Sequence, residues 1–76
     1  MPTVLKVKGF RFFFYSNDHL PKHIHVEKSG KTAKFILYPI QLVKSKKFSA
    51  SELSEIRTLI ELNLQLFDQK WDEHFN

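Results

Sequence analysis

Three histidines stand close together in the chain, in the pattern His19-x-x-x-His23-x-His25. Alternate residues of a β-strand point to the same side, so a strand through this segment would place the imidazoles of His23 and His25 roughly 6–7 Å apart. The unperturbed pKa of histidine, about 6.5, lies near neutral pH and suits proton transfer. Flanked by Arg11 and Lys34, such a pair would suit cleavage of an RNA phosphodiester: one ring would take the 2′-hydroxyl proton and the other would protonate the leaving oxygen. We therefore take His23 and His25, with His19, as candidate catalytic residues.

Two other roles fit the same histidines. A divalent ion could be held by imidazole and carboxylate donors, namely His19, His23, His25 and Asp18. Three cations nearby in the expected fold would oppose a dication: Lys22, Lys34 and Arg11. In the third role the rings pack against neighbours and hydrogen-bond locally, without chemistry. We predict no metal and no cofactor for this chain.

The composition limits the class of protein. The chain has 76 residues, of which 42% are hydrophobic and 14% aromatic, so residues 1–76 are expected to form a single folded domain. It has no cysteine, which excludes disulfides, thiolate metal sites and cysteine nucleophiles. The longest apolar-aromatic run, residues 12–15, is far shorter than the roughly 20 residues of a membrane span, and no signal sequence precedes it. A cytoplasmic protein without a membrane partner is expected.

The charge is divided unevenly along the chain. Residues 1–50 carry a net charge of +8, and residues 51–76 carry −4, which together give the net charge of +4. A basic part joined to an acidic part indicates that one surface could meet a polyanion while the other faces water or a basic partner.

The alternation of polar and apolar residues predicts two β-hairpins. The first joins residues 4–8 to 10–15 through a turn at Lys8-Gly9, so that Lys6 lies across from Arg11. Two positive charges across from each other destabilise a sheet, so we expect an anion or an acidic side chain beside them. The second joins residues 22–28 to 31–38 through Ser29-Gly30, and its register sets His25 across from Lys34.

The C-terminal third predicts a helix. Ser49 and Glu52 form an S-x-x-E capping box, and no Gly or Pro interrupts the sequence from there to the end. One apolar stripe runs through Leu53, Ile56, Ile60, Leu64, Phe67, Trp71 and Phe75. A single helix over 50–75 would be about 39 Å long at ~1.5 Å per residue, so its last turns would extend beyond the domain. The exposed apolar end of the helix could then form a homodimer. The alternative is two shorter helices with a break near Leu62-Asn63.

These elements predict an α+β fold: a four-stranded antiparallel sheet of two hairpins with one long C-terminal helix packed on one face. The other face would interleave basic and aromatic side chains, as surfaces that stack bases and hold phosphates do. The candidate nucleic-acid-binding residues on it are Lys6, Arg11, Phe13, Tyr15 and Lys34. The same face also suits a protein partner, with Phe13, Ile36 and Tyr38 as an apolar centre.

Several segments together resemble a known family. They are GFRFFFYSNDH at residues 9–19, HIHVE at 23–27, AKF at 33–35, and FS at 48–49 followed by EL at 52–53. They resemble the small bacterial domain-of-unknown-function family 4160. By position, the polar signature of that family falls on Arg11, Tyr15, Ser16, Asn17, Asp18, His19, His23, His25 and Lys34.

The resemblance implies a function through gene context. Members of this family are commonly encoded beside a second small protein of domain-of-unknown-function family 2442, which suggests a type II toxin-antitoxin pair. We therefore expect the toxin component, which would act on RNA or translation and be blocked by that small antitoxin. A binding module without enzymatic activity, either an antitoxin or a regulator, is the alternative.

Overall fold

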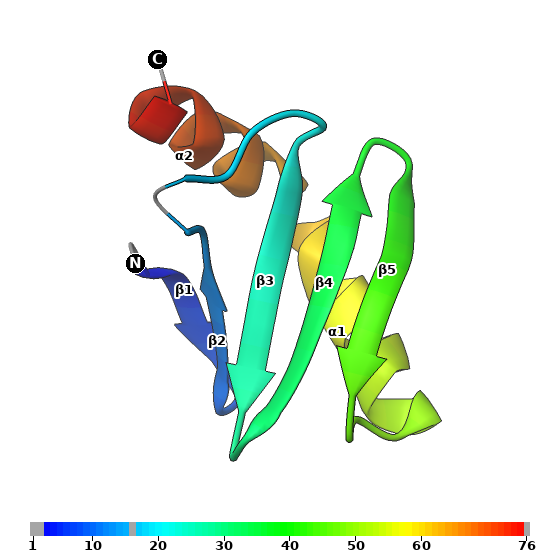
Figure 1. Cartoon of the computed structure of the whole chain (residues 1–76). Coiled ribbons are helices and arrows are strands. Elements are labelled where there is room, and N and C mark those ends of the chain that lie inside the picture. Colours follow the sequence, from blue (N-terminus) through cyan, green and yellow to red (C-terminus); the bar gives the residue numbers. More distant parts are fainter. Residues whose placement is uncertain (1–2, 16, 76) are drawn as a thin grey trace.

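The computed structural model describes residues 3–15 and 17–75, so Ser16 lies outside the described part. Five strands form one antiparallel sheet in chain order: β1 (Thr3–Val7), β2 (Phe10–Phe13), β3 (His23–Lys28), β4 (Lys31–Leu37) and β5 (Ile40–Lys46). Two helices, α1 (Ala50–Leu62) and α2 (Leu64–Phe75), follow the sheet and lie on one side of it (Figure 1).

Both predicted hairpins are confirmed. Lys8 and Gly9 adopt φ values of 53° and 85°, and Ser29 and Gly30 adopt 50° and 79°, as a two-residue turn with left-handed backbone requires. The expected registers are present too, because Lys6 lies across from Arg11 and His25 lies across from Lys34. The pairing of β2 with β3 joins the two hairpins, with Phe13 across from His25.

The prediction of four strands is wrong, because residues 40–46, between the second predicted hairpin and the predicted helix, form the edge strand β5. The chain reverses at Tyr38-Pro39, so that Leu37 pairs with Ile40, and the proline lies in the turn, where its missing N–H is not needed. Only Ile40 is half-buried, and the rest of β5 is exposed. A lysine-rich strand at a sheet edge has little apolar alternation, which is why its signal is weak in the sequence.

The prediction of one long helix is also wrong, because the helix breaks at Asn63. The Asn63 backbone N–H donates to the carbonyl oxygens of Leu59 and Ile60, and its side-chain Nδ2 donates to Leu59 O at 2.8 Å. The break keeps the molecule to a longest extent of 34 Å, shorter than an unbroken helix of about 39 Å would be. The capping box at the start of α1 is confirmed: Ser49 and Glu52 each accept a hydrogen bond from the backbone N–H of the other.

The core lies between the sheet and the two helices. Alternate residues of the strands meet apolar residues of the helices there: Phe10, Phe12, Ile24, Val26, Phe35 and Leu37 against Ile56, Leu59, Ile60, Phe67 and Trp71. Trp71 is only 4% exposed and packs edge-on against Phe14 at 5.2 Å between ring centroids. The C-terminal helix therefore does not present the exposed apolar end from which a homodimer was expected. Among the described residues, neither helix is long and apolar enough to cross a membrane.

Candidate functional site

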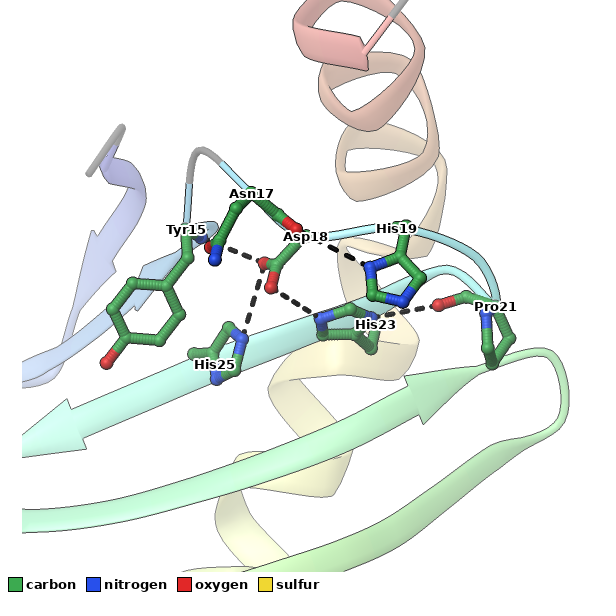
Figure 2. Close-up of polar contacts among 7 residues, drawn as sticks. All are labelled: Tyr15, Asn17, Asp18, His19, Pro21, His23 and His25. Carbon is green, nitrogen blue, oxygen red and sulfur yellow. Dashed lines mark hydrogen bonds and ion pairs between the residues drawn. The ribbon is translucent and has the colours of Figure 1, made fainter.

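A carboxylate and two imidazoles meet above the amino-terminal end of β3. The Asp18 side chain lies between the two rings (Figure 2), with Oδ1 at 3.1 Å from Nε2 of His23 and Oδ2 at 3.3 Å from Nε2 of His25. The three donor atoms all lie within 4.8 Å of one another. This group of Asp18, His23 and His25 is called the Asp-His-His cluster below.

Backbone contacts hold Asp18 in this place. The loop between β2 and β3 turns back at Tyr15, whose N–H donates to Oδ2 of Asp18 at 2.8 Å and whose carbonyl accepts from the Asp18 N–H at 3.1 Å. The far end of the loop is fixed by Lys22, which forms ion pairs with Asp68 and Asp72 on α2. The strand pairing and these loop contacts together place a loop carboxylate over two strand histidines.

The two nitrogens of His23 both face protein atoms. Its Nδ1 lies 2.8 Å from the carbonyl oxygen of Pro21, and because a carbonyl only accepts, Nδ1 must carry a proton. Its Nε2 faces Asp18, and the ring packs against Trp71 of α2. The residue is 5% exposed, so His23 is a buried group at the border of the core.

His25 is held between aromatic rings on the open face of the sheet. The Phe13 ring stacks on it at 5.5 Å and the Tyr15 ring meets it edge-on at 4.6 Å. Its Nε2 atom is buried, and so is that of His23; neither atom has a hydrogen-bond partner of acceptable geometry, although both lie close to Asp18.

The environment shifts the pKa values of this cluster. Burial alone raises the pKa of the Asp18 carboxyl, but the Tyr15 N–H and the two imidazoles outweigh it and hold the pKa below its usual value. Burial lowers the pKa of His25, and the charges of His23 and Lys34 act in the same direction, against the attraction of Asp18. His25 is therefore biased towards its neutral form.

A basic groove lies beside the cluster on the same face. It is lined by Phe13, Tyr15, His25, Val26, Thr32, Ala33, Lys34, Lys44, Ser45 and Lys46, with no carboxylate among these residues. Lys34 lies directly across from Lys44, and Lys46 follows on the same side of β5. Of the ion pairs formed within residues 3–15 and 17–75, none includes Lys34, Lys44 or Lys46.

The structure brings only some of the predicted site residues together. Arg11 is not available to a phosphate, because its side chain donates to Glu27 at 2.7 Å and to Thr3 at 3.0 Å. Glu27, which lies across from Arg11, is the acidic neighbour expected from the pairing of Arg11 with Lys6. Lys6 is an exposed residue of the edge strand β1 and is not part of the groove lining.

The aromatic candidates differ in their availability. Phe13 is 4% exposed, with the Arg11 guanidinium 4.2 Å from its centroid and His25 stacked on it, so it cannot stack a base. Tyr15 is 41% exposed and lines the groove. His19 is exposed and lies outside the Asp-His-His cluster, although it lines a hollow beside it.

Three residues of this site were not among the predicted site residues. Lys44 and Lys46 follow the second predicted hairpin, and the recognition of β5 as a strand would have placed them beside Lys34. Asp18 was grouped with the histidines as a possible metal ligand and through the polar signature of the family, but not as a predicted site residue.

The fold and site define a small α+β domain whose open sheet face carries a largely buried Asp-His-His cluster, in which Asp18 and His25 are half-buried, and a basic groove. The family described as domain of unknown function DUF4160 matches residues 9–72, most of the chain, and the chain belongs to that family. No curated protein and no solved structure matches it.

Proposed function

We propose that this protein is the toxin component of a toxin-antitoxin pair and that it acts on RNA by binding single-stranded RNA in the basic groove. The observation that carries the proposal is the pairing of Lys34 with Lys44. Like charges placed across from each other in a sheet are mutually destabilising, and an RNA phosphate in the groove would relieve that repulsion.

The charge distribution supports a polyanion over a neutral ligand. The cations on the helix side are neutralised locally, as Lys31 is by Glu52, Lys22 by Asp68 and Asp72, and Lys8 by Glu55. The groove lysines have no such partners among the described residues, so their field reaches solvent. The exposed ring of Tyr15, which lines the groove, offers a surface for one base.

The histidine geometry favours binding over acid-base cleavage. A general acid and a general base must each reach the proton that they transfer. Nε2 of His23 and of His25 is buried against Asp18, and Nδ1 of His23 faces Pro21, which leaves Nδ1 of His25 as the one remaining imidazole nitrogen of the pair. The proposal therefore assigns no turnover to this pair.

A matched pair of variants tests RNA binding. The triple variant K34Q/K44Q/K46Q removes the groove charges, and K8Q/R57Q/K70Q removes the same number of charges from ion pairs that involve the helices. Titration with labelled single-stranded RNA should show at least tenfold weaker binding for the first and a change below about twofold for the second. If both variants lost RNA affinity equally, the binding would depend on the net charge of the chain, and the assignment of the groove would be wrong.

Overproduction in cells tests the toxin part separately. The wild-type protein should arrest growth, the groove variant should not, and co-expression of the small antitoxin should restore growth. If the wild-type protein binds RNA but is harmless when produced alone, the toxin assignment is refuted and a regulatory binding module remains.

A further inference from the structure

The short contacts within the Asp-His-His cluster cannot all be hydrogen bonds, because some of them bring two acceptor atoms together. Because Nδ1 of His23 donates to Pro21 O, the Nε2 atom of the neutral ring carries a lone pair. That lone pair faces Oδ1 of Asp18, which is also an acceptor, at 3.1 Å. Two acceptors at this distance need a cation or a second proton between them.

His25 supplies a third possible ligand atom close to the other two. Its Nε2 lies 3.3 Å from Oδ2 of Asp18, and it shares with Nε2 of His23 the lack of a well-aligned hydrogen bond. The side chain of His23 is 94% buried, so water cannot freely satisfy its nitrogen. We propose that Asp18, His23 and His25 bind one divalent transition-metal ion, for which Zn²⁺ is the best fit.

The donor set selects the kind of ion. Two imidazoles and one carboxylate suit Zn²⁺ and its first-row neighbours, whereas Mg²⁺ and Ca²⁺ prefer oxygen donors. Bonds of about 2.0–2.2 Å in tetrahedral geometry separate the ligand atoms by roughly 3.4 Å. Each imidazole faces its own oxygen of Asp18 at close to that value, 3.1 Å from Oδ1 for His23 and 3.3 Å from Oδ2 for His25. One ligand atom from each of the three residues lies within 4.8 Å of the others, so the side chains would draw together around the ion.

The surrounding contacts are those that orient metal ligands. A metal-bound histidine usually donates its other ring N–H to a carbonyl or carboxylate, as His23 does to Pro21. The Asp18 carboxylate is fixed by the Tyr15 N–H, and the His25 ring is held between Phe13 and Tyr15. The ligands would thus be positioned before the ion binds.

Two of the three cations that would oppose a dication are neutralised. Arg11 is paired with Glu27, and Lys22 is paired with two aspartates of α2. Only Lys34, across from His25, keeps its charge near the site. A hollow lined by Asp18, His19, His23 and Lys34 among others lies beside the cluster and gives an ion a path towards it.

Zinc titration of the purified protein tests the proposal. With a chromophoric chelator as competitor, one Zn²⁺ should bind per chain, and binding should raise the melting temperature. Asp18→Asn, His23→Gln and His25→Gln should each weaken Zn²⁺ binding by about 100-fold or more. His74→Gln, which removes an exposed histidine outside the cluster, should change it by less than about twofold. Absence of stoichiometric binding, or equal losses in the His74 variant, would overturn the proposal.

A measurement on the wild-type chain covers the case in which a cluster variant does not fold. Nitrogen-15 spectra of the imidazoles should show Zn²⁺ shifting Nε2 of His23 and His25 while Nδ1 of His23 stays protonated. Shifts confined to His19 and His74, or no shift at all, would show that the cluster does not bind the ion and would overturn the proposal.

Metal binding and RNA binding can fail independently. Lys34→Gln removes a positive charge that opposes Zn²⁺ and that also contributes to the basic groove. We expect this variant to bind Zn²⁺ several-fold more tightly and RNA more weakly. Unchanged or weaker Zn²⁺ binding would contradict the proposed position of the ion, whatever the result with RNA.

Discussion

The salt dependence of RNA binding follows from the number of unpaired lysines in the groove. Lys34, Lys44 and Lys46 line the groove and form no ion pair within the described residues, so we expect three phosphate contacts. For single strands, log K falls against log salt with a slope of about −0.7 per contact, which gives about −2 for three contacts. Binding should therefore weaken roughly 20-fold between about 50 and 200 mM salt.

Removing the lysines stepwise should reduce this slope. The double variant K44Q/K46Q keeps one contact, so its slope should be about −0.7 and its loss over the same salt range about threefold. Fluorescence anisotropy of a labelled single-stranded RNA, measured at several salt concentrations, gives the slope directly. His25 should add little at neutral pH, because burial lowers its pKa and favours the uncharged ring.

Two results would refute this reasoning. A slope near −2 in the double variant would mean that other cations contact the phosphates. A slope that falls equally in K8Q/R57Q/K70Q would mean that the net charge of the chain, and not the groove, attracts the RNA.

Three further predictions concern the fold. Phe67→Ala should lower the free energy of unfolding by about 3–5 kcal/mol, because the ring is fully buried against Phe12, whereas Leu62→Ala, at a residue 76% exposed, should change it by less than about 0.5 kcal/mol; urea denaturation measures both. Lys31 and the Ser49 N–H lower the pKa of Glu52 from 4.5 to about 2, so the stabilisation from this carboxylate should be complete above pH 4.5 and lost as the pH falls towards 2. Lys31→Met should shrink that acid-induced loss in thermal melts, and a loss of unchanged size would assign it to other carboxylates. Arg11→Met should cost about 1–2 kcal/mol in the same denaturation assay, since it removes the bond to Glu27, and an unchanged stability would contradict that contact.

The hairpins were predictable because their determinants are local. Lys8-Gly9 and Ser29-Gly30 supply the left-handed backbone that two-residue turns need, and the alternating apolar residues then leave one register in which a single face is buried. The capping box at Ser49 and Glu52 is likewise a local feature, and it set the start of α1 correctly. The pairing of His25 with Lys34 followed from the turn alone.

The fifth strand and the break in the helix were decided by the whole domain. The exposed β5 is a strand because β4 offers it an open edge, and its own sequence lacks the regular alternation of polar and apolar residues that marks the other strands. The apolar stripe of the C-terminal third continues past Asn63, so its periodicity did not predict the break. The break lets Phe67 and Trp71 cover the end of the sheet at Phe12 and Phe14.

The sequence by itself determined the local pieces of this protein: two hairpins, the start of a helix, and two histidines on one strand beside a lysine. Only the tertiary structure decided what those histidines face. The loop brings Asp18 over His23 and His25, while Glu27 neutralises Arg11 through a pairing of β2 with β3 that no turn specifies. Contacts between neighbours in sequence follow from backbone and turn chemistry, whereas contacts across the sheet depend on how the core packs. The proposed metal and RNA sites depend on contacts of the second kind.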